Sequence, residues 1–208
     1  MQDYQEPGVD PEKDDWVVAY SHMEMFKLKQ NNLLTTLPIL PTQWKVSFKM
    51  LPNHPMAPPR CDSMNSYWCR PPQPKWRTVL FMTDGSALQK RGKVKSGFRA
   101  GPAVYFHLEK GLNVQNSFNQ PRRHSKTFHE VSKKSAGDWT DVKIEQKLLE
   151  GKLMYRVIID GLVRLSKENR KPENRTNVEV WAANPPSSPG SRDPPVIDGW
   201  MKDLIIKI

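Results

Sequence analysis

Apolar and polar residues alternate most regularly over residues 139–161, WTDVKIEQKLLEGKLMYRVIIDG. Apolar side chains take every second position on both sides of Glu150 and Gly151. The positions predicted to face a core are Val142, Ile144, Leu148, Tyr155, Val157 and Ile159. A period of two is that of a β-strand with one buried face, and glycine suits the positive backbone angle of a hairpin turn. This stretch therefore predicts a β-hairpin.

Shorter patterns predict more strands. Trp44, Val46, Phe48 and Met50 alternate with lysine and serine, which indicates a strand with one polar face. Further strands are predicted at 79–83, 103–107, 111–115, from Val178 to Ala182 and from Leu204 to Ile208, and residues 16–20 and 23–28 give a first short strand or an ordered lead-in. We expect some nine or ten strands and no amphipathic helix.

The remaining segments are predicted to be loops. Pro38 and Pro41 break any helix after Leu37, and residues 51–75 and 83–102 form two long loops. Residues 116–137 form a polar stretch, and residues 165–176, LSKENRKPENRT, form a charged connection. The fold class predicted from this layout is all-β, a two-sheet antiparallel jelly-roll sandwich with long loops.

The chain of 208 residues has room for one large β-domain. We expect an acidic N-terminal arm and lead-in over residues 1–30, followed by the sandwich over residues 31–208. No run is long and apolar enough to span a membrane as a helix, and the acidic start is not a signal peptide. Either the chain is cytosolic, or a secretory signal was removed before this numbering begins.

The formal net charge of +10 is unevenly distributed. Residues 1–15 carry a net charge of −5, so residues 16–208 carry +15. The acids of the arm are Asp3, Glu6, Asp10, Glu12, Asp14 and Asp15, against Lys13. A basic body attracts polyanions in general, and its charge alone does not choose among nucleic acid, sulfated glycan and acidic membrane.

The two cysteines, Cys61 and Cys69, lie in a proline-rich loop with seven residues between them. A disulfide would close a small ring there and imply an oxidising compartment, whereas two free thiols are the alternative. Their spacing is not that of a zinc site, and the five histidines show no ligand spacing either, so we expect no metal and no cofactor.

Several phrases resemble the concanavalin A-like jelly-roll superfamily, especially laminin G-like and lectin-like secreted modules. The phrases are WKVSF from Trp44, GPAVYF from Gly101, WTDVKIEQ from Trp139, YRVIIDG from Tyr155, NVEVWAA from Asn177 and WMKDLIIKI from Trp200. The likeness covers residues 33–208. It implies an extracellular protein that recognises glycans or glycosylated partners through rim loops or the concave sheet face.

The chain departs from this pattern at two kinds of site. Calcium-dependent members use paired loop carboxylates, whereas here Asp84 stands alone among basic residues, so calcium is doubtful. Hydrolytic members resemble one another in an alternating Glu-x-Asp-x-Glu strand. The nearest counterpart here, Asp141 to Glu145, has Lys143 between its two acids.

Two basic loops are the candidate site for an anionic ligand. The anionic ligand-binding residues predicted from them are Lys90, Arg91, Lys93, Lys95, Arg99, Arg122, Arg123 and Lys126. Arginine forks and lysine charges match sulfate and phosphate groups, although each loop taken alone can equally be a solvated surface. A third basic set, which includes Lys167 and Lys171, is interspersed with acids and is interpreted as ordinary surface.

Two other features suggest recognition. Tyr67, Trp68 and Trp76 are candidate aromatic contacts to a sugar ring or a protein pocket, or they pin their own loop. Asn174 begins an Asn-Arg-Thr glycosylation sequon just before a predicted strand.

These observations predict a secreted, non-enzymatic recognition module for an anionic, sulfated glycan or an acidic protein partner. We do not expect nucleic acid as its ligand, and no catalytic residue is assigned. One alternative is a glycan-cleaving enzyme on the same fold. Another is a structural matrix or subunit-interface protein that forms an oligomer through its acidic arm.

Overall fold

The computed structural model describes residues 16–29, 31–52, 77–83, 101–107, 111–115, 128–129, 138–183 and 199–208. Every regular element in these ranges is a β-strand. The strands are β1 (Val18–His22), β2 (Phe26–Lys27), β3 (Asn32–Leu40), β4 (Trp44–Pro52), β5 (Arg77–Thr83), β6 (Ala103–His107), β7 (Gly111–Gln115), β8 (Phe128–His129), β9 (Thr140–Leu149), β10 (Lys152–Ile159), β11 (Leu162–Glu168), β12 (Arg175–Ala182) and β13 (Gly199–Lys207).

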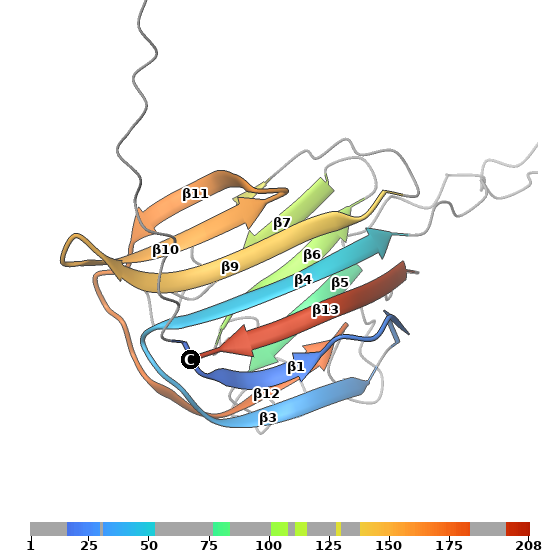
Figure 1. The fold of residues 1–208 in the computed structure, drawn as a ribbon, viewed down its shortest axis with the longest axis horizontal. Helices are drawn as coiled ribbons and strands as arrows, with labels where there is room; N and C mark the ends of the chain where they lie inside the picture. The colour runs from blue at the N-terminus through green and yellow to red at the C-terminus, as the bar shows by residue number, and fades with distance from the viewer. Residues whose placement is uncertain are drawn as a thin grey trace, which may run out of the picture.

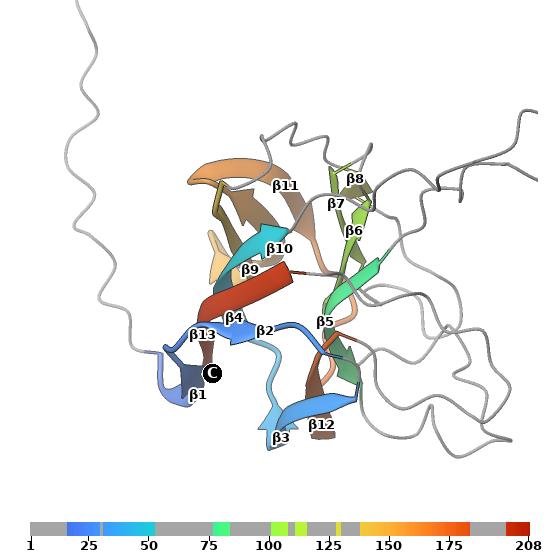
Figure 2. The same cartoon turned by 90° about the vertical axis from the view of Figure 1, so that its right-hand side faces the viewer.

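The strands form two antiparallel sheets packed face to face. Sheet A has the order β1-β13-β4-β9-β10-β11, with β2 also paired to β13, and sheet B has the order β3-β12-β5-β6-β7-β8. Figure 1 looks onto sheet A, with β5, β6 and β7 of sheet B behind it, and Figure 2 shows the two sheets as two layers. The predicted two-sheet jelly-roll sandwich is confirmed.

The described part of the predicted lead-in, residues 16–29, is part of sheet A. β1 and β2 both pair with β13, the last strand of the chain. Val17 and Ile208 exchange two backbone hydrogen bonds of 2.8 and 2.9 Å. The first and last described segments therefore lie side by side at one edge of the sandwich.

The core lies between the sheets and follows the alternation in the sequence. The residues of sheet A buried there are Trp44, Val46, Phe48, Met50, Val142, Ile144, Tyr155, Val157, Ile159, Met201, Leu204 and Ile206. Trp44 and Tyr155 meet edge to face, with ring centroids 6.2 Å apart. Burial of each large apolar side chain stabilises the fold by about 1.5–3 kcal/mol. The residues between these positions must point to the opposite, outer face of sheet A.

Two tight turns set the register of β9, β10 and β11. Glu150 and Gly151 have φ values of 49° and 74°, and Asp160 and Gly161 have φ values of 51° and 78°. Two successive positive φ angles are typical of the two-residue turn that matches the twist of a β-hairpin. The predicted hairpin is confirmed, and the second turn starts another one.

This second hairpin shows that the prediction for the start of the connection at residues 165–176 was wrong. Residues 162–168 form β11, which pairs with β10 and forms an edge of sheet A. Its charged side chains conceal the period of two, because an edge strand that is exposed on both faces needs no apolar alternation. The short β8 similarly lies within the stretch expected to be only polar loop.

A strand was also missed at residues 32–40. β3 includes Pro38, which was interpreted only as a helix breaker. Because β3 is the edge strand of sheet B and pairs only with β12, a proline can be accommodated there without the loss of a central hydrogen bond.

Leu148 was wrongly placed on the core face. Its side chain is 57% exposed, because the core under β9 ends at Gln146, the partner of Trp44. Beyond that point the Leu148 amide donates a 2.9 Å hydrogen bond to Gln43 Oε1, in the turn before β4.

Candidate binding face on sheet A

Most of the binding residues predicted from the sequence lie outside the described residues. These are the basic-loop residues Lys90, Arg91, Lys93, Lys95, Arg99, Arg122, Arg123 and Lys126, the aromatic residues Tyr67, Trp68 and Trp76, and Cys61 and Cys69. Asn174 is described, and it is exposed immediately before β12, where an acceptor for glycosylation needs to be. The candidate site that the structure itself presents is a different one.

The outer face of sheet A is rich in basic side chains. β4, β9, β10 and β13 each bury one set of alternate residues against sheet B, so the other set points outward. The described cations of the outer set are Lys45, Lys49, Lys143, Lys147, Lys152, Arg156, Lys202 and Lys207, and the acids of this face, with Glu168 of the neighbouring β11, are Asp141, Glu145, Glu168 and Asp203. Cations therefore outnumber acids on this part of the face.

One row of directly opposed residues crosses four strands. Lys207 of β13 pairs with Lys45 of β4, Lys45 pairs with Glu145 of β9, and Glu145 pairs with Arg156 of β10. We call these four residues the charged row. The charged row thus aligns three cations, Lys45, Arg156 and Lys207, with one carboxylate across neighbouring strands.

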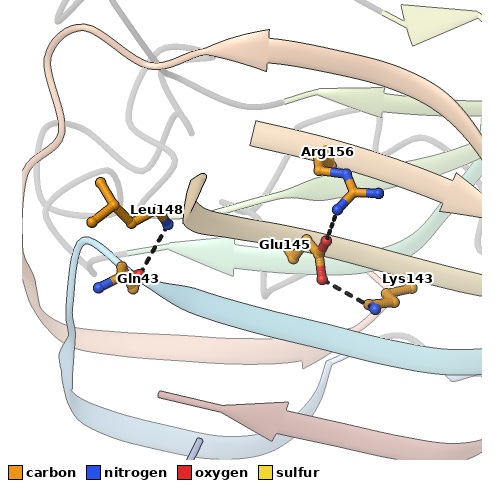
Figure 3. A network of polar contacts seen from close by, with 5 residues as sticks. All are labelled: Gln43, Lys143, Glu145, Leu148 and Arg156. Carbon is orange, nitrogen blue, oxygen red and sulfur yellow. Dashed lines mark hydrogen bonds and ion pairs between the residues drawn. The ribbon is translucent and has the colours of Figure 1, made fainter. Parts of the chain in front are cut away.

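Glu145 lies at the centre of this row and is almost completely buried. Its Oε1 atom is 3.1 Å from Arg156 Nη1, and its Oε2 atom is 3.2 Å from Lys143 Nζ (Figure 3). The glutamate side chain is 1% exposed, whereas those of Lys143 and Arg156 are 27% and 22% exposed. The carboxylate therefore holds the charged groups of both cations, whose side chains remain partly exposed to solvent.

Lys147 adds a further cation beside the charged row. It is two residues beyond Glu145 on the same face of β9, and it is buried. Burial lowers the pKa of Lys147 from its usual 10.5, and the nearby Arg156 guanidinium lowers this pKa further. Positive charge is thus concentrated around Glu145, in an arrangement that favours the approach of an anion.

A network of amide side chains fixes the end of the sheet next to Lys147. Asn169 Nδ2 donates a 2.7 Å hydrogen bond to Gln146 Oε1, and Gln146 Nε2 donates one of 2.5 Å to the Thr42 carbonyl. The Lys171 amide in turn donates to Asn169 Oδ1 at 3.1 Å. Two of the connections that cross between the sheets, β3 to β4 and β11 to β12, are held against β9 by these bonds. The network is structural, and it makes the adjacent face rigid.

Two contacts organise the opposite end of the basic face. Lys49 Nζ forms a 3.1 Å ion pair with Asp203, which occupies an irregularity in β13 and has a φ of 53°. Lys202 Nζ lies 4.4 Å from the ring centroid of Trp139, a cation–π contact. The basic side chains therefore extend along β4 and β13 as well as across the strands.

A signal in the sequence could have revealed this cluster. Once the turn is placed at Glu150 and Gly151, counting back along both strands brings Glu145 opposite Arg156. Lys143 and Lys147 lie two residues away on the same face. The partnership with Lys45 could not be found in this way, because it depends on the pairing of β4 with β9.

Other kinds of site gain no support from the described residues. In these ranges no three His, Cys, Asp or Glu side chains gather as a possible metal site. The loop that contains Asp84, the candidate calcium position, lies outside them. The same described ranges include no helix that is long and apolar enough to cross a membrane.

With this geometry in place, comparison with solved structures gives the class of fold. The carbohydrate recognition domain of Emp47p matches with a TM-score of 0.52 and 8% identity, over 96% of this chain and 90% of that one. A heptameric SAP-like pentraxin from Limulus polyphemus matches with a TM-score of 0.48 and 13% identity, over 90% and 70% of the two chains. The alginate lyase Aly36B, as a mutant in complex with alginate trisaccharide, gives 0.46 and 13%, over 89% and 83%.

The likeness to the Emp47p domain shows that the two chains share a fold. At 8% identity it shows nothing more about this chain. No family model matches the sequence, and no curated protein matches it. The function must therefore be argued from the chemistry of the face.

Proposed function

We propose that this chain is a non-enzymatic recognition module that binds an anionic glycan on the outer face of sheet A. The observation that supports this most directly is the charged row, in which Lys45 and Lys207 lie directly opposite one another next to the Glu145 ion pairs. A sulfate or carboxylate placed over the two lysines would form charge-assisted hydrogen bonds with them.

The Glu145 ion pairs favour a ligand-binding role for this face over that of an ordinary solvated surface without a ligand. A lysine on an ordinary surface is flexible and loses side-chain entropy when it binds a ligand. Here Glu145 holds Arg156 and Lys143 in fixed positions before any ligand arrives. Preorganised cations bind an anion at a lower entropic cost than mobile ones do.

An extended polyanion is the ligand class that suits the shape of this charge. The cations cover several strands of a sheet face and are not gathered at a single point. The net charge of +15 on residues 16–208 adds long-range attraction. The basic residues at 90–99 and 122–126, which lie outside the described residues, are a second candidate for contact with the ligand, and an acidic protein surface is the alternative ligand.

The compartment that we propose is extracellular. A sulfated or uronate-rich glycan would be met there, and the exposed Asn174 would be available for glycosylation. A disulfide between Cys61 and Cys69 would be stable in the same oxidising environment. Light scattering with and without residues 1–15 tests the separate prediction that the acidic arm forms an oligomer, and an unchanged mass would exclude it.

Chromatography across a salt series tests the proposal. The protein is applied to heparin and to a cation exchanger of matched charge density, alongside a row variant with Lys45→Gln and Lys207→Gln. A loop variant carries alanine at Lys90, Arg91, Lys93 and Lys95. A connection variant, Lys167→Gln with Lys171→Gln, removes the same charge as the row variant from the third basic set.

We expect the wild-type protein to elute from heparin at higher salt than from the exchanger. The row variant should lose this difference, and the connection variant should keep it. Equal elution of the wild type from both columns would mean that the charge is diffuse, and it would overturn the proposal. Release of shortened oligosaccharides during prolonged incubation would contradict the non-enzymatic part.

A further inference from the structure

An open groove lies at the end of sheet A that is formed by β2 and β13. Its volume is about 630 Å³, and it is lined by Met25, Phe26, Lys27, Lys29, Asn31, Asn32 and Trp200. An indole ring, two lysines and two side-chain amides thus converge on one concave space. The groove thus combines apolar and aromatic surface with lysine and asparagine side chains at its lining.

Trp200 belongs to the same outer face as the charged row. Its neighbours Gly199 and Met201 are buried, whereas Trp200 is only partly buried and therefore points outward. It pairs with Lys27 of β2 on one side and with Leu51 of β4 on the other. The groove is thus a continuation of the basic face and not a separate pocket in the core.

The groove and the charged row lie at opposite ends of the same two strands. Lys45 and Leu51 are six residues apart on β4, which corresponds to about 20 Å at the rise of a β-strand. Between them the face carries Lys49 and its partner Lys202. A ligand that lay along β4 and β13 would pass these two lysines before it reached Trp200.

We propose that this groove is a sugar-ring subsite for the end of an acidic oligosaccharide that lies along β4 and β13. Trp200 would stack on the apolar face of one ring, a role that suits an amphipathic aromatic side chain at a wet surface. Lys27 and Lys29 would meet the carboxylate or sulfate of that ring, and the Asn31 and Asn32 amides would bond its hydroxyl groups. The inference rests on the proposed function and specifies how its ligand is oriented.

Titration calorimetry with heparin-derived oligosaccharides, from disaccharide to octasaccharide, tests the orientation. For the wild type, affinity should rise with length until the ligand reaches from the charged row to the groove. Trp200→Ala should remove the gain in affinity from the longest ligands, so that the octasaccharide binds about tenfold more weakly than it does to the wild type. Trp200→Phe should retain most of it, because an aromatic face remains.

Two further variants keep the result interpretable if Trp200→Ala does not fold. Lys29→Ala leaves the indole in place and should also weaken the longest ligand more than the shortest. Leu33→Ala, at an exposed position on sheet B, is the control and should match the wild type at every length. Wild-type binding of every ligand by Trp200→Ala and Lys29→Ala would overturn the inference.

The failure of this inference can be told apart from the failure of the proposed function. If the row variant weakens binding while the groove variants do not, the groove is not part of the site and the basic face still binds the glycan. If the groove variants weaken binding and the row variant does not, the groove binds a sugar but the proposed orientation is wrong. If the wild-type protein binds no ligand of the series, both proposals fall.

Discussion

Replacing Glu145 with glutamine is the perturbation that most directly tests the structure of the basic face. The substitution keeps the size of the side chain and removes the negative charge that is paired with Arg156 and Lys143. Removal of one partner from a fully buried ion pair costs about 3–5 kcal/mol. Arg156 and Lys143 remain about one-quarter exposed, so solvent compensates for part of that loss.

We therefore expect Glu145→Gln to lower the free energy of unfolding by about 2–3 kcal/mol. In a chain of 208 residues a loss of this size lowers the melting temperature by roughly 5–10 °C. Urea denaturation followed by tryptophan fluorescence gives the free energy, and a scan by circular dichroism gives the melting temperature.

A matched control comes from Glu168, whose ion pair with Arg170 is far more exposed. The two groups are 3.4 Å apart, and the Arg170 side chain is 78% exposed. Glu168→Gln should therefore cost less than about 1 kcal/mol. Equal effects of the two substitutions would refute the argument that Glu145 holds a preorganised cluster. A double-mutant cycle with Arg156→Gln would measure the coupling directly.

Three other substitutions have defined outcomes. Because the pKa of Lys147 is lowered in the folded protein, the unfolded chain binds more protons than the folded one just below pH 10.5, so the free energy of unfolding of the wild type should rise with pH there. Lys147→Met should abolish this rise, and a rise that persists in urea denaturation of the variant would contradict the argument. Asn169→Ala should cost about 2–4 kcal/mol of unfolding free energy, since it leaves the buried Gln146 amide without the bond that Asn169 donates, and a cost below about 0.5 kcal/mol would show that the network is dispensable. Asn174→Gln should remove a glycan mass from protein secreted by cultured cells, and an identical mass for wild type and variant would exclude glycosylation there.

The sequence predicts the sandwich well because its central strands are buried on one face. Apolar side chains alternate with polar ones in the runs from Trp44 and from Val142, and the structure buries the predicted side chains except Leu148. The strands that were missed are edge strands. β3 and β11 have one neighbour each, so their sequences can contain Pro38 or a series of charges that would be excluded from a central strand.

The candidate face was harder to predict than the fold. The opposition of Glu145 and Arg156 follows from the turn at Glu150 and Gly151, so it could be counted from the sequence. The opposition of Lys45 and Lys207 depends on which strands are neighbours in sheet A. The strand order places β4 beside β13, the last strand of the chain. No local sequence pattern predicts this pairing.

The groove at Trp200 shows the same limit. Lys27 and Trp200 pair across β2 and β13, although they are far apart in the sequence. In the sequence, Trp200 stands out only as the first residue of WMKDLIIKI. Its potential to bind a ligand depends on residues that the fold brings beside it. Tertiary pairing creates this feature and local propensity does not.

The central claim is most directly tested by titration calorimetry of the row variant and the connection variant with one heparin octasaccharide of defined length. Both variants lose two lysines, so their net charge is the same. The account predicts that Lys45→Gln with Lys207→Gln weakens binding by about tenfold or more, whereas Lys167→Gln with Lys171→Gln weakens it by about twofold or less. Equal losses of affinity in the two variants would contradict a defined binding face on sheet A.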